Sequence, residues 1–344
     1  MNNKYKNGER LDPRLHSFIN LIGDAPEKRN STRDEAVAAA NTPDAIAGRE
    51  RWQQFVNLND NEQIAPSKGL KIWSEKITSH PDNNSINLQI IRPDTDEILP
   101  CVYYIHGGAM SQLSCYLGNY RAWGKMIAAH GVAVVMVDFR NSIGPSSVEE
   151  TGPFPCGFND CLSGLRWLHA NSEKLRIDSS QVTVSGDSGG GNLSMALAIK
   201  LNRSNELKLI AGLYLFCPYL MGDYPNDAFP SSIENNKILL DLNGNGPVLG
   251  YGIEHLEKRN PLAWPYFAQD ADLKDLPPVV ISANECDPLR DENIFFYRKL
   301  LAAGVAARCR LIMGTMHATE MFLPTACPEI SHDGAAHLAL FAKK

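Results

Sequence analysis

The residues with the clearest chemical potential are Gly186-Asp187-Ser188-Gly189-Gly190, a G-x-S-x-G pentapeptide. The apolar run at 181–185 precedes it and a helix-forming run at 192–201 follows it. A serine on such a strand-to-helix turn adopts a strained backbone and is exposed for attack as a nucleophile. Gly186 and Gly190 lack a Cβ atom, so the strand and the helix can approach closely. The start of the helix also favours developing negative charge. The pattern predicts that Ser188 is a nucleophile.

A serine hydroxyl needs a base to remove its proton, and the base needs a carboxylate to hold it in one tautomer. His317 follows the last apolar strand, predicted at 307–313. Asp287 follows the strand predicted at 279–282. We therefore predict His317 as the base and Asp287 as the acid that orients it.

The acid has an alternative in the same segment. Glu285 lies two residues before Asp287 and is the second candidate, whereas Asp291 and Glu292 are interpreted as charges at the start of the next helix. The remaining histidines outside the loop at 106 are interpreted as structural or surface residues: His16, His80, His130, His169, His255, His332 and His337.

A second glycine-rich turn lies upstream, where His106-Gly107-Gly108-Ala109 follows the apolar run at 101–105. Ester hydrolysis passes through a tetrahedral oxyanion, which backbone N–H groups stabilise. We predict that the N–H groups of Gly108, Ala109 and Gly189 form this oxyanion hole, with Gly107 as a further candidate. His106 is expected to brace the loop through a hydrogen bond.

These residues depend on a scaffold that alternates strands and helices. Strands are predicted at 70–77, 85–92, 101–105, 132–137, 181–185, 209–216, 279–282 and 307–313. Helices are predicted at 32–40, 42–58, 120–130, 158–170, 192–201, 293–303 and 333–344. This alternation indicates an α/β fold with a mostly parallel central sheet and helices on both faces.

With these motifs in view, the chain resembles the hormone-sensitive-lipase family of esterases, also called bacterial family IV, from about Leu99 to Phe322. The resemblance rests on the segments at 106–108, 186–190 and 287–292, on His317, and on the segments at 138–140 and 153–155 with Asp160. It implies an α/β-hydrolase fold with a helical cap, no cofactor, and activity on esters with short or medium acyl chains. Ala109 stands where many members have glycine, Gly189 replaces a usual alanine, and Asn141-Ser142 replaces a common Leu-Ala.

The family's cap matches two polar segments. Residues 1–65 would form its N-terminal part and 218–262 an insertion into it. The catalytic core would consist of 66–217 and 263–344.

Composition excludes several other classes of protein. The 344 residues have a net charge of −6, so no basic surface for nucleic acid is indicated. No signal peptide or membrane span is recognisable, which favours a cytoplasmic protein with reduced thiols at its eight cysteines. The start of a calcium loop at Asp241 lacks a glutamate at its twelfth position, where Gly252 stands, and no metal site is predicted. A homodimer is left open.

The sequence therefore predicts a serine carboxylesterase that prefers acyl chains of about two to six carbons. A deacetylase or amidase could use the same residues. A ligand-binding protein that kept the fold without catalysis is the third hypothesis.

Overall fold

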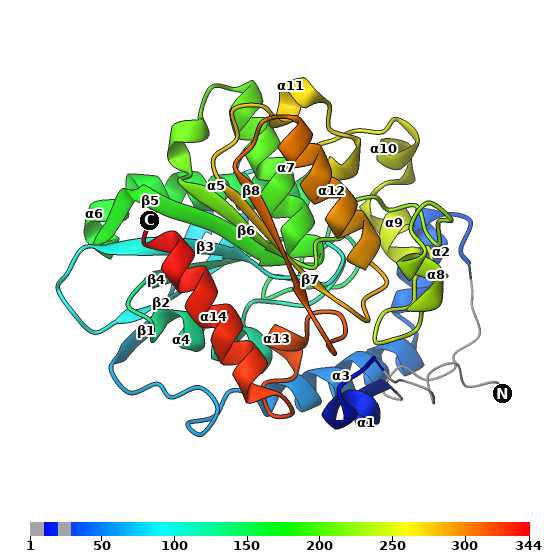
Figure 1. Ribbon diagram of the computed structural model, residues 1–344, viewed down its shortest axis with the longest axis horizontal. Coiled ribbons are helices and arrows are strands. Elements are labelled where there is room, and N and C mark those ends of the chain that lie inside the picture. Colours follow the sequence, from blue (N-terminus) through cyan, green and yellow to red (C-terminus); the bar gives the residue numbers. More distant parts are fainter. Residues whose placement is uncertain (1–9, 20–28) are drawn as a thin grey trace.

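The computed structural model describes residues 10–19 and 29–344, and its centre is an eight-stranded sheet in the order β1-β2-β4-β3-β5-β6-β7-β8 (Figure 1). The strands are β1 (Leu70–Thr78), β2 (Ser85–Pro93), β3 (Leu99–Ile105), β4 (Ala133–Asp138), β5 (Ile177–Asp187), β6 (Gly212–Phe216), β7 (Val279–Asn284) and β8 (Ala307–Ile312). The β1–β2 and β2–β4 pairs are antiparallel, and every other neighbouring pair is parallel. The predicted fold class is confirmed.

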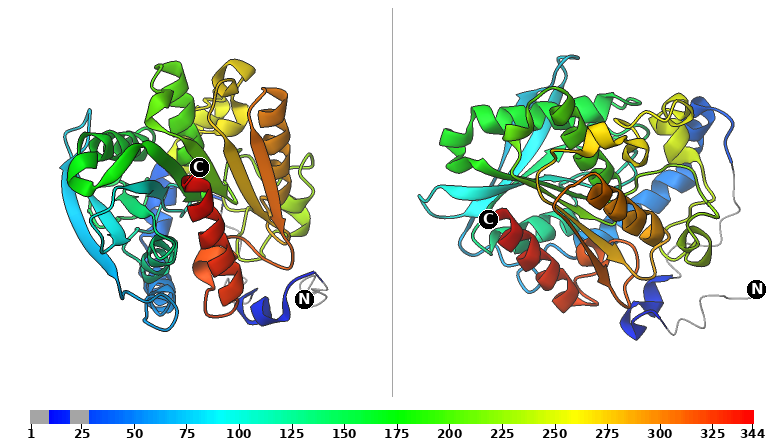
Figure 2. Two further views of the ribbon diagram at one scale, coloured as in Figure 1. Left: turned by 60° about the vertical axis from the view of Figure 1, so that its left-hand side comes forward. Right: turned by 45° about the horizontal axis from the view of Figure 1, so that its top comes forward.

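Helices cover both faces of this sheet (Figure 2). The α-helices are α1 (His16–Ile19), α2 (Arg33–Ala40), α3 (Pro43–Asn57), α4 (Gly118–Ala128), α5 (Cys156–Ala170), α6 (Ser172–Leu175), α7 (Gly189–Arg203), α8 (Ser231–Glu234), α9 (Gly246–Tyr251), α10 (Ile253–Glu257), α11 (Asp270–Leu273), α12 (Arg290–Ala302), α13 (Thr319–Phe322) and α14 (Pro328–Ala342). Short 3-10 helices are η1 (Pro13–Leu15), η2 (Leu207–Leu209) and η3 (Pro265–Phe267).

The alternation of side chains along the strands divides the core into two layers. On β4, Val135 and Val137 pack in the layer that contains α5, α7 and α12. Val134 and Met136 point the other way, into the layer that contains α4 and α14. Because both faces of β4 are buried, its sequence is apolar at nearly every position.

The two helices predicted before the sheet are confirmed as α2 and α3. Each begins after a threonine whose hydroxyl accepts a backbone N–H, Thr32 from Glu35 at 3.2 Å and Thr42 from Ala45 at 3.3 Å. Pro43 occupies the first turn of α3, where its missing N–H costs nothing. The predictions that fall on residues 1–9 and 20–28 lie outside the described residues.

Several boundaries differ from the sequence predictions. β6 begins at Gly212, later than predicted, because residues 207–209 form the turn η2, in which Leu209 N–H donates to Glu206 O at 3.0 Å. β5 extends back to Ile177 through pairing with Leu99. The segment 218–262 contains the short helices α8, α9 and α10, which its Asn-, Gly- and Pro-rich sequence did not predict.

The N-terminal segment lies beside the 218–262 segment, as α2 and α9 show in Figure 1. Asn30 and Asn245 exchange two hydrogen bonds, of 3.0 and 2.8 Å. The Arg33 guanidinium donates to Gly250 O at 3.2 Å and to Ser142 O at 2.9 Å. The bonds to Asn245 and Gly250 join the two segments that the sequence assigns to a cap, and the bond to Ser142 joins them to the predicted core. The cap itself stays a prediction.

Two further features concern the chain as a whole. In the described ranges, no helix is long and apolar enough to cross a lipid bilayer. The eight cysteines are free thiols.

Candidate active site

Ser188 occupies the turn between β5 and α7, with φ of 52° and ψ of −118°. A residue with a side chain rarely adopts this positive φ, so the backbone of the turn is strained and the surrounding hydrogen bonds must maintain it. Ser188 N–H donates to Phe216 O at 2.9 Å, and Ser188 O accepts from Tyr219 N–H at 3.0 Å. The residue is 8% exposed. The strand-turn-helix setting predicted for Ser188 is therefore present.

The glycines around Ser188 are sterically required, as expected. A Cβ atom on Gly186 would lie 2.5 Å from Ile105 O. One on Gly190 would overlap the same carbonyl oxygen. The turn that carries Ser188, the predicted nucleophile, therefore packs directly against the end of β3, from which the 106–110 loop departs.

His317 and Asp287 form a hydrogen-bonded pair, with Nδ1 to Oδ2 at 2.8 Å. The other oxygen of Asp287 accepts from Leu289 N–H at 2.8 Å, which fixes the orientation of the carboxylate. Burial acts to lower the pKa of His317, but the carboxylates around it, Asp287 first and then Asp187 and Glu320, together raise the pKa above its ordinary value. Because Nδ1 faces Asp287, Nε2 is the ring nitrogen left to act as a base.

The other acidic residues of this segment have different partners. Glu285 Oε2 accepts from Gly314 N–H at 2.8 Å. Glu292 lies in the first turn of α12, as predicted, but it is not a surface charge: it is 1% exposed and accepts from Leu220 N–H at 2.9 Å and from the Tyr224 hydroxyl. Burial raises the pKa of Glu292 to about 8.

The Asp287–His317 pair lies at the same end of the parallel strands as Ser188, because all three residues follow the carboxyl ends of their strands. Cys217 directly follows Phe216, the acceptor of the Ser188 N–H. Its Sγ lies within 4.8 Å of ligand atoms of both Asp287 and His317. No hydrogen bond between Ser188 Oγ and His317 Nε2 occurs within the described ranges. The structure therefore joins Asp287 to His317 directly and places Ser188 in the turn after β5, which β6 separates from β7.

The predicted oxyanion loop packs onto the residue after Ser188. A Cβ on Gly189 would lie 2.6 Å from Met110 N and 2.8 Å from Ala109 N. Gly107 N–H, by contrast, donates to the Tyr120 hydroxyl at 2.9 Å and is occupied. The N–H groups of Gly108 and Ala109 donate to no other described residue. Gly107 is thus the weakest of the four predicted donors.

The segments that flank this loop hold it in place. His106 Nδ1 lies 2.9 Å from Gly107 O, and its ring stacks on Phe139 with centroids 4.3 Å apart, so the predicted bracing is confirmed. Burial lowers the pKa of His106, which favours the neutral ring. Ser142 N–H donates to Met110 O at 2.9 Å, and the Asn141 amide donates to Leu113 O at 2.8 Å. The amide bond accounts for asparagine at position 141, whereas the Ser142 bond comes from its backbone and does not depend on its side chain.

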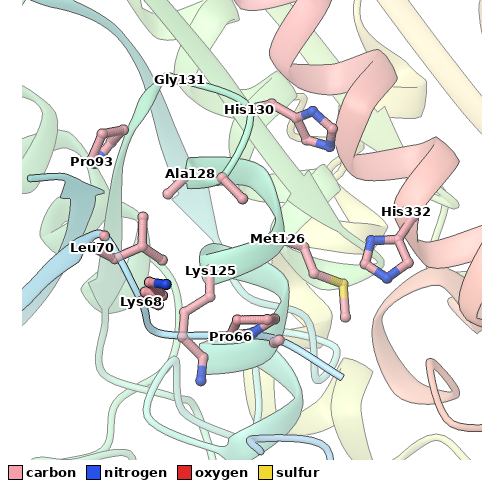
Figure 3. Close-up of a pocket in the computed structure, with 13 residues that line it drawn as sticks. Pro66, Lys68, Leu70, Pro93, Lys125, Met126, Ala128, His130, Gly131 and His332 are labelled. Carbon is pink, nitrogen blue, oxygen red and sulfur yellow. The ribbon is translucent and has the colours of Figure 1, made fainter. Parts of the chain in front are cut away.

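A pocket of about 420 Å³ lies elsewhere (Figure 3). Its lining includes Lys68, Lys125, His130 and His332, and it borders the residues that precede β4. Ser188 instead follows the last residue of β5, and β4 and β5 both run parallel to β3. The pocket is therefore at the amino end of the parallel strands, away from the candidate site.

Comparison with known proteins agrees with this geometry. The family described as "alpha/beta hydrolase fold" matches residues 102–321. The chain belongs to the α/β-hydrolase fold family, within its hormone-sensitive-lipase group. The solved structure of esterase Est22 is 51% identical over 98% of both chains, with a TM-score of 0.94. Brefeldin A esterase, titled a bacterial homologue of human hormone-sensitive lipase, is 31% identical over 98% of this chain and 94% of its own, with a TM-score of 0.86.

A curated relative shares a smaller region. Carboxylesterase NlhH of Mycobacterium tuberculosis is 33% identical over 221 residues, which are 62% of this chain. The chain spans 64% of the length of this relative. These proteins are what the chain is similar to.

Sequence reasoning missed two residues near the site. Tyr104 and Tyr120 bond to the carboxylate of Asp187 with their hydroxyl groups, at 2.9 and 3.0 Å. In the sequence both are aromatic residues of buried elements, and their pattern is that of ordinary core side chains.

Proposed function

We propose that this protein is a carboxylesterase that cleaves small carboxylic esters through an acyl-enzyme. Ser188 Oγ attacks the ester carbonyl while His317 Nε2 takes its proton. The N–H groups of Gly108, Ala109 and Gly189 stabilise the oxyanion. His317 then protonates the leaving alcohol, and water releases the acid by the reverse sequence.

The observation that supports this function best is the Asp287–His317 bond of 2.8 Å at the sheet edge where Ser188 has its strained backbone. A buried histidine whose pKa is raised by a carboxylate is suited to accept a proton. The names of the related proteins, esterases and a carboxylesterase, point to the same reaction.

A finer proposal concerns the substrate. The segment at 218–262 that we assign to the cap is polar and rich in glycine and asparagine, with few exposed apolar side chains. We propose that it favours acyl chains of about two to six carbons, because a longer chain would gain no apolar surface there.

The test is a rate profile with p-nitrophenyl esters of increasing acyl length, since an Est22 structure has been solved with p-nitrophenol. We expect kcat/KM to peak at short chains and the S188A variant to lose turnover. No turnover by the wild type, or equal turnover by S188A, would refute the proposed function. A rate that rises steadily to long chains would refute only the chain-length proposal. Matched p-nitroanilide substrates distinguish an amidase.

A further inference from the structure

Asp187 is a second buried carboxylate beside the nucleophile. It is 0% exposed and precedes Ser188. Tyr104 O–H on β3 donates to its Oδ1 at 2.9 Å, and Tyr120 O–H on α4 donates to its Oδ2 at 3.0 Å. No salt bridge to Asp187 occurs in the part of the chain that the structure describes. A buried carboxylate without a salt bridge is costly, and its presence needs a reason.

The same carboxylate reaches the oxyanion loop through one hydroxyl. Gly107 N–H donates to Tyr120 Oη at 2.9 Å, and Tyr120 in turn donates to Asp187. A Cβ on Gly107 would overlap Asp187 Oδ2 and lie 3.0 Å from Tyr120 Oη. Two hydrogen bonds in series thus run from Gly107 N–H to Tyr120 and from Tyr120 O–H to Asp187 Oδ2, and we call this hydrogen-bonded series the loop chain. Only one residue separates Gly107 from Ala109, whose N–H lies close to Gly189.

The direction of the loop chain depends on the charge of Asp187. Tyr120 has one proton, and it can accept from Gly107 and still donate that proton only if Asp187 Oδ2 is an acceptor. A protonated Oδ2 would be a competing donor, so the Tyr120 proton would lose its acceptor. Ionised Asp187 is therefore the state in which all three groups are satisfied.

We propose that Asp187 is a positioning residue whose ionised carboxylate holds the oxyanion loop in place through Tyr120. This inference rests on the proposed esterase function. Asp187 does not contact the substrate in this account. It fixes Gly107, and with it the N–H groups that follow.

The charged and titratable groups around Asp187 make the effect pH-dependent. Burial raises the pKa of Asp187 to about 6, although both tyrosine hydroxyls and His317 oppose the rise. His317 and Asp187 attract each other, and Asp187 contributes to the raised pKa of His317. Cys217, at the end of β6, is also close enough for Asp187 to raise the pKa of its thiol. Two protonations, at His317 and at Asp187, should therefore shape the acid limb of kcat/KM.

The experiment compares D187N and Y120F with Y103F as the matched control. Tyr103 is the neighbouring buried tyrosine on β3, and its hydroxyl donates to Cys161 O at 2.8 Å in the other core layer. With p-nitrophenyl acetate and active-site titration, we expect D187N and Y120F to lower kcat about tenfold with little change in KM. In D187N the acid limb should become a one-proton limb and move to lower pH. Y103F should keep the wild-type profile.

A wild-type kcat in Y120F, or a wild-type kcat together with a two-proton acid limb in D187N, would overturn the proposal. If D187N does not fold, Y120F decides the question by itself, because it removes a single oxygen atom. A loss that Y103F shares would also overturn it, since that would be the signature of general core damage. Failure of the esterase function would appear differently, as absent turnover in the wild type or turnover in S188A.

Discussion

Replacing Gly189 with alanine tests the contact between the nucleophile turn and the oxyanion loop. The new Cβ would lie 2.6 Å from Met110 N and 2.8 Å from Ala109 N and Cα, and all three are backbone atoms. Ordinary contact begins at 3.4 Å, so the loop must move by about 0.8 Å, the difference between 3.4 and 2.6 Å. A shift of about 1 Å in a catalytic group costs up to about 100-fold in rate.

We therefore expect G189A to lower kcat by about 10- to 100-fold, which corresponds to about 1.4–2.7 kcal/mol in the activation free energy. KM should change little, because the displaced N–H groups stabilise the oxyanion, which forms only in the transition state. The assay is steady-state hydrolysis of p-nitrophenyl acetate, normalised to titrated active sites. G48A is the control, since its methyl group would meet no atom closer than Arg51 Nη2 at 3.9 Å.

A second substitution sharpens this test. Ala109 has a φ of 52°, which glycine adopts more readily than alanine. The double variant G189A/A109G should therefore recover part of the lost kcat, because the loop can then shift with less strain. Wild-type kcat in G189A, or no coupling between the two substitutions, would refute the reasoning about this contact.

Two other predictions concern the acidic residues after β7. D287N should lower kcat by about 10⁴-fold, as the loss of a triad acid does elsewhere. E285Q should keep the wild-type kcat, because Glu285 bonds to Gly314 and not to His317. Comparable losses of kcat in both variants would undermine the assignment of Asp287 as the acid. Burial raises the pKa of Glu292 in the folded state from its ordinary value of 4.5 to about 8. Between these two pH values the folded state binds more protons than the unfolded state. The free energy of unfolding should therefore fall as pH rises from about 4.5 to about 8. In urea unfolding at pH 5 and pH 8, the free energy of unfolding of E292Q should rise relative to that of the wild type by up to a few kcal/mol as pH rises. A difference between the two proteins that does not change with pH would contradict the raised pKa of Glu292.

The sequence predicted the parallel sheet because buried strands such as β4 are apolar on both faces. It predicted α2 from its alanine-rich, helix-forming run and α3 from Thr42 and Pro43, which are local signals for a helix start. It predicted the Asp287–His317 pair from their positions after successive strands. These features are local or follow from the topology of parallel sheets.

The remaining features depend on contacts between distant segments. No local pattern shows that Tyr120 bonds to both Gly107 and Asp187, or that Glu292 is buried against Leu220 and Tyr224. The short helices of the 218–262 segment were missed because four to six residues give too weak a periodic signal. The start of β6 was misplaced because the apolar run continues through the turn η2.

The central claim is that Ser188 forms a covalent acyl-enzyme, and rapid mixing with p-nitrophenyl acetate followed by peptide mass spectrometry tests it most directly. If deacylation is the slower step, a burst of p-nitrophenol equal to the enzyme concentration should precede the steady state. In acid-quenched enzyme the peptide containing Ser188 should be heavier by one acetyl group. S188A should show neither. Turnover with the acetyl group on another residue, or with an unmodified Ser188 peptide during a stoichiometric burst, would contradict the account.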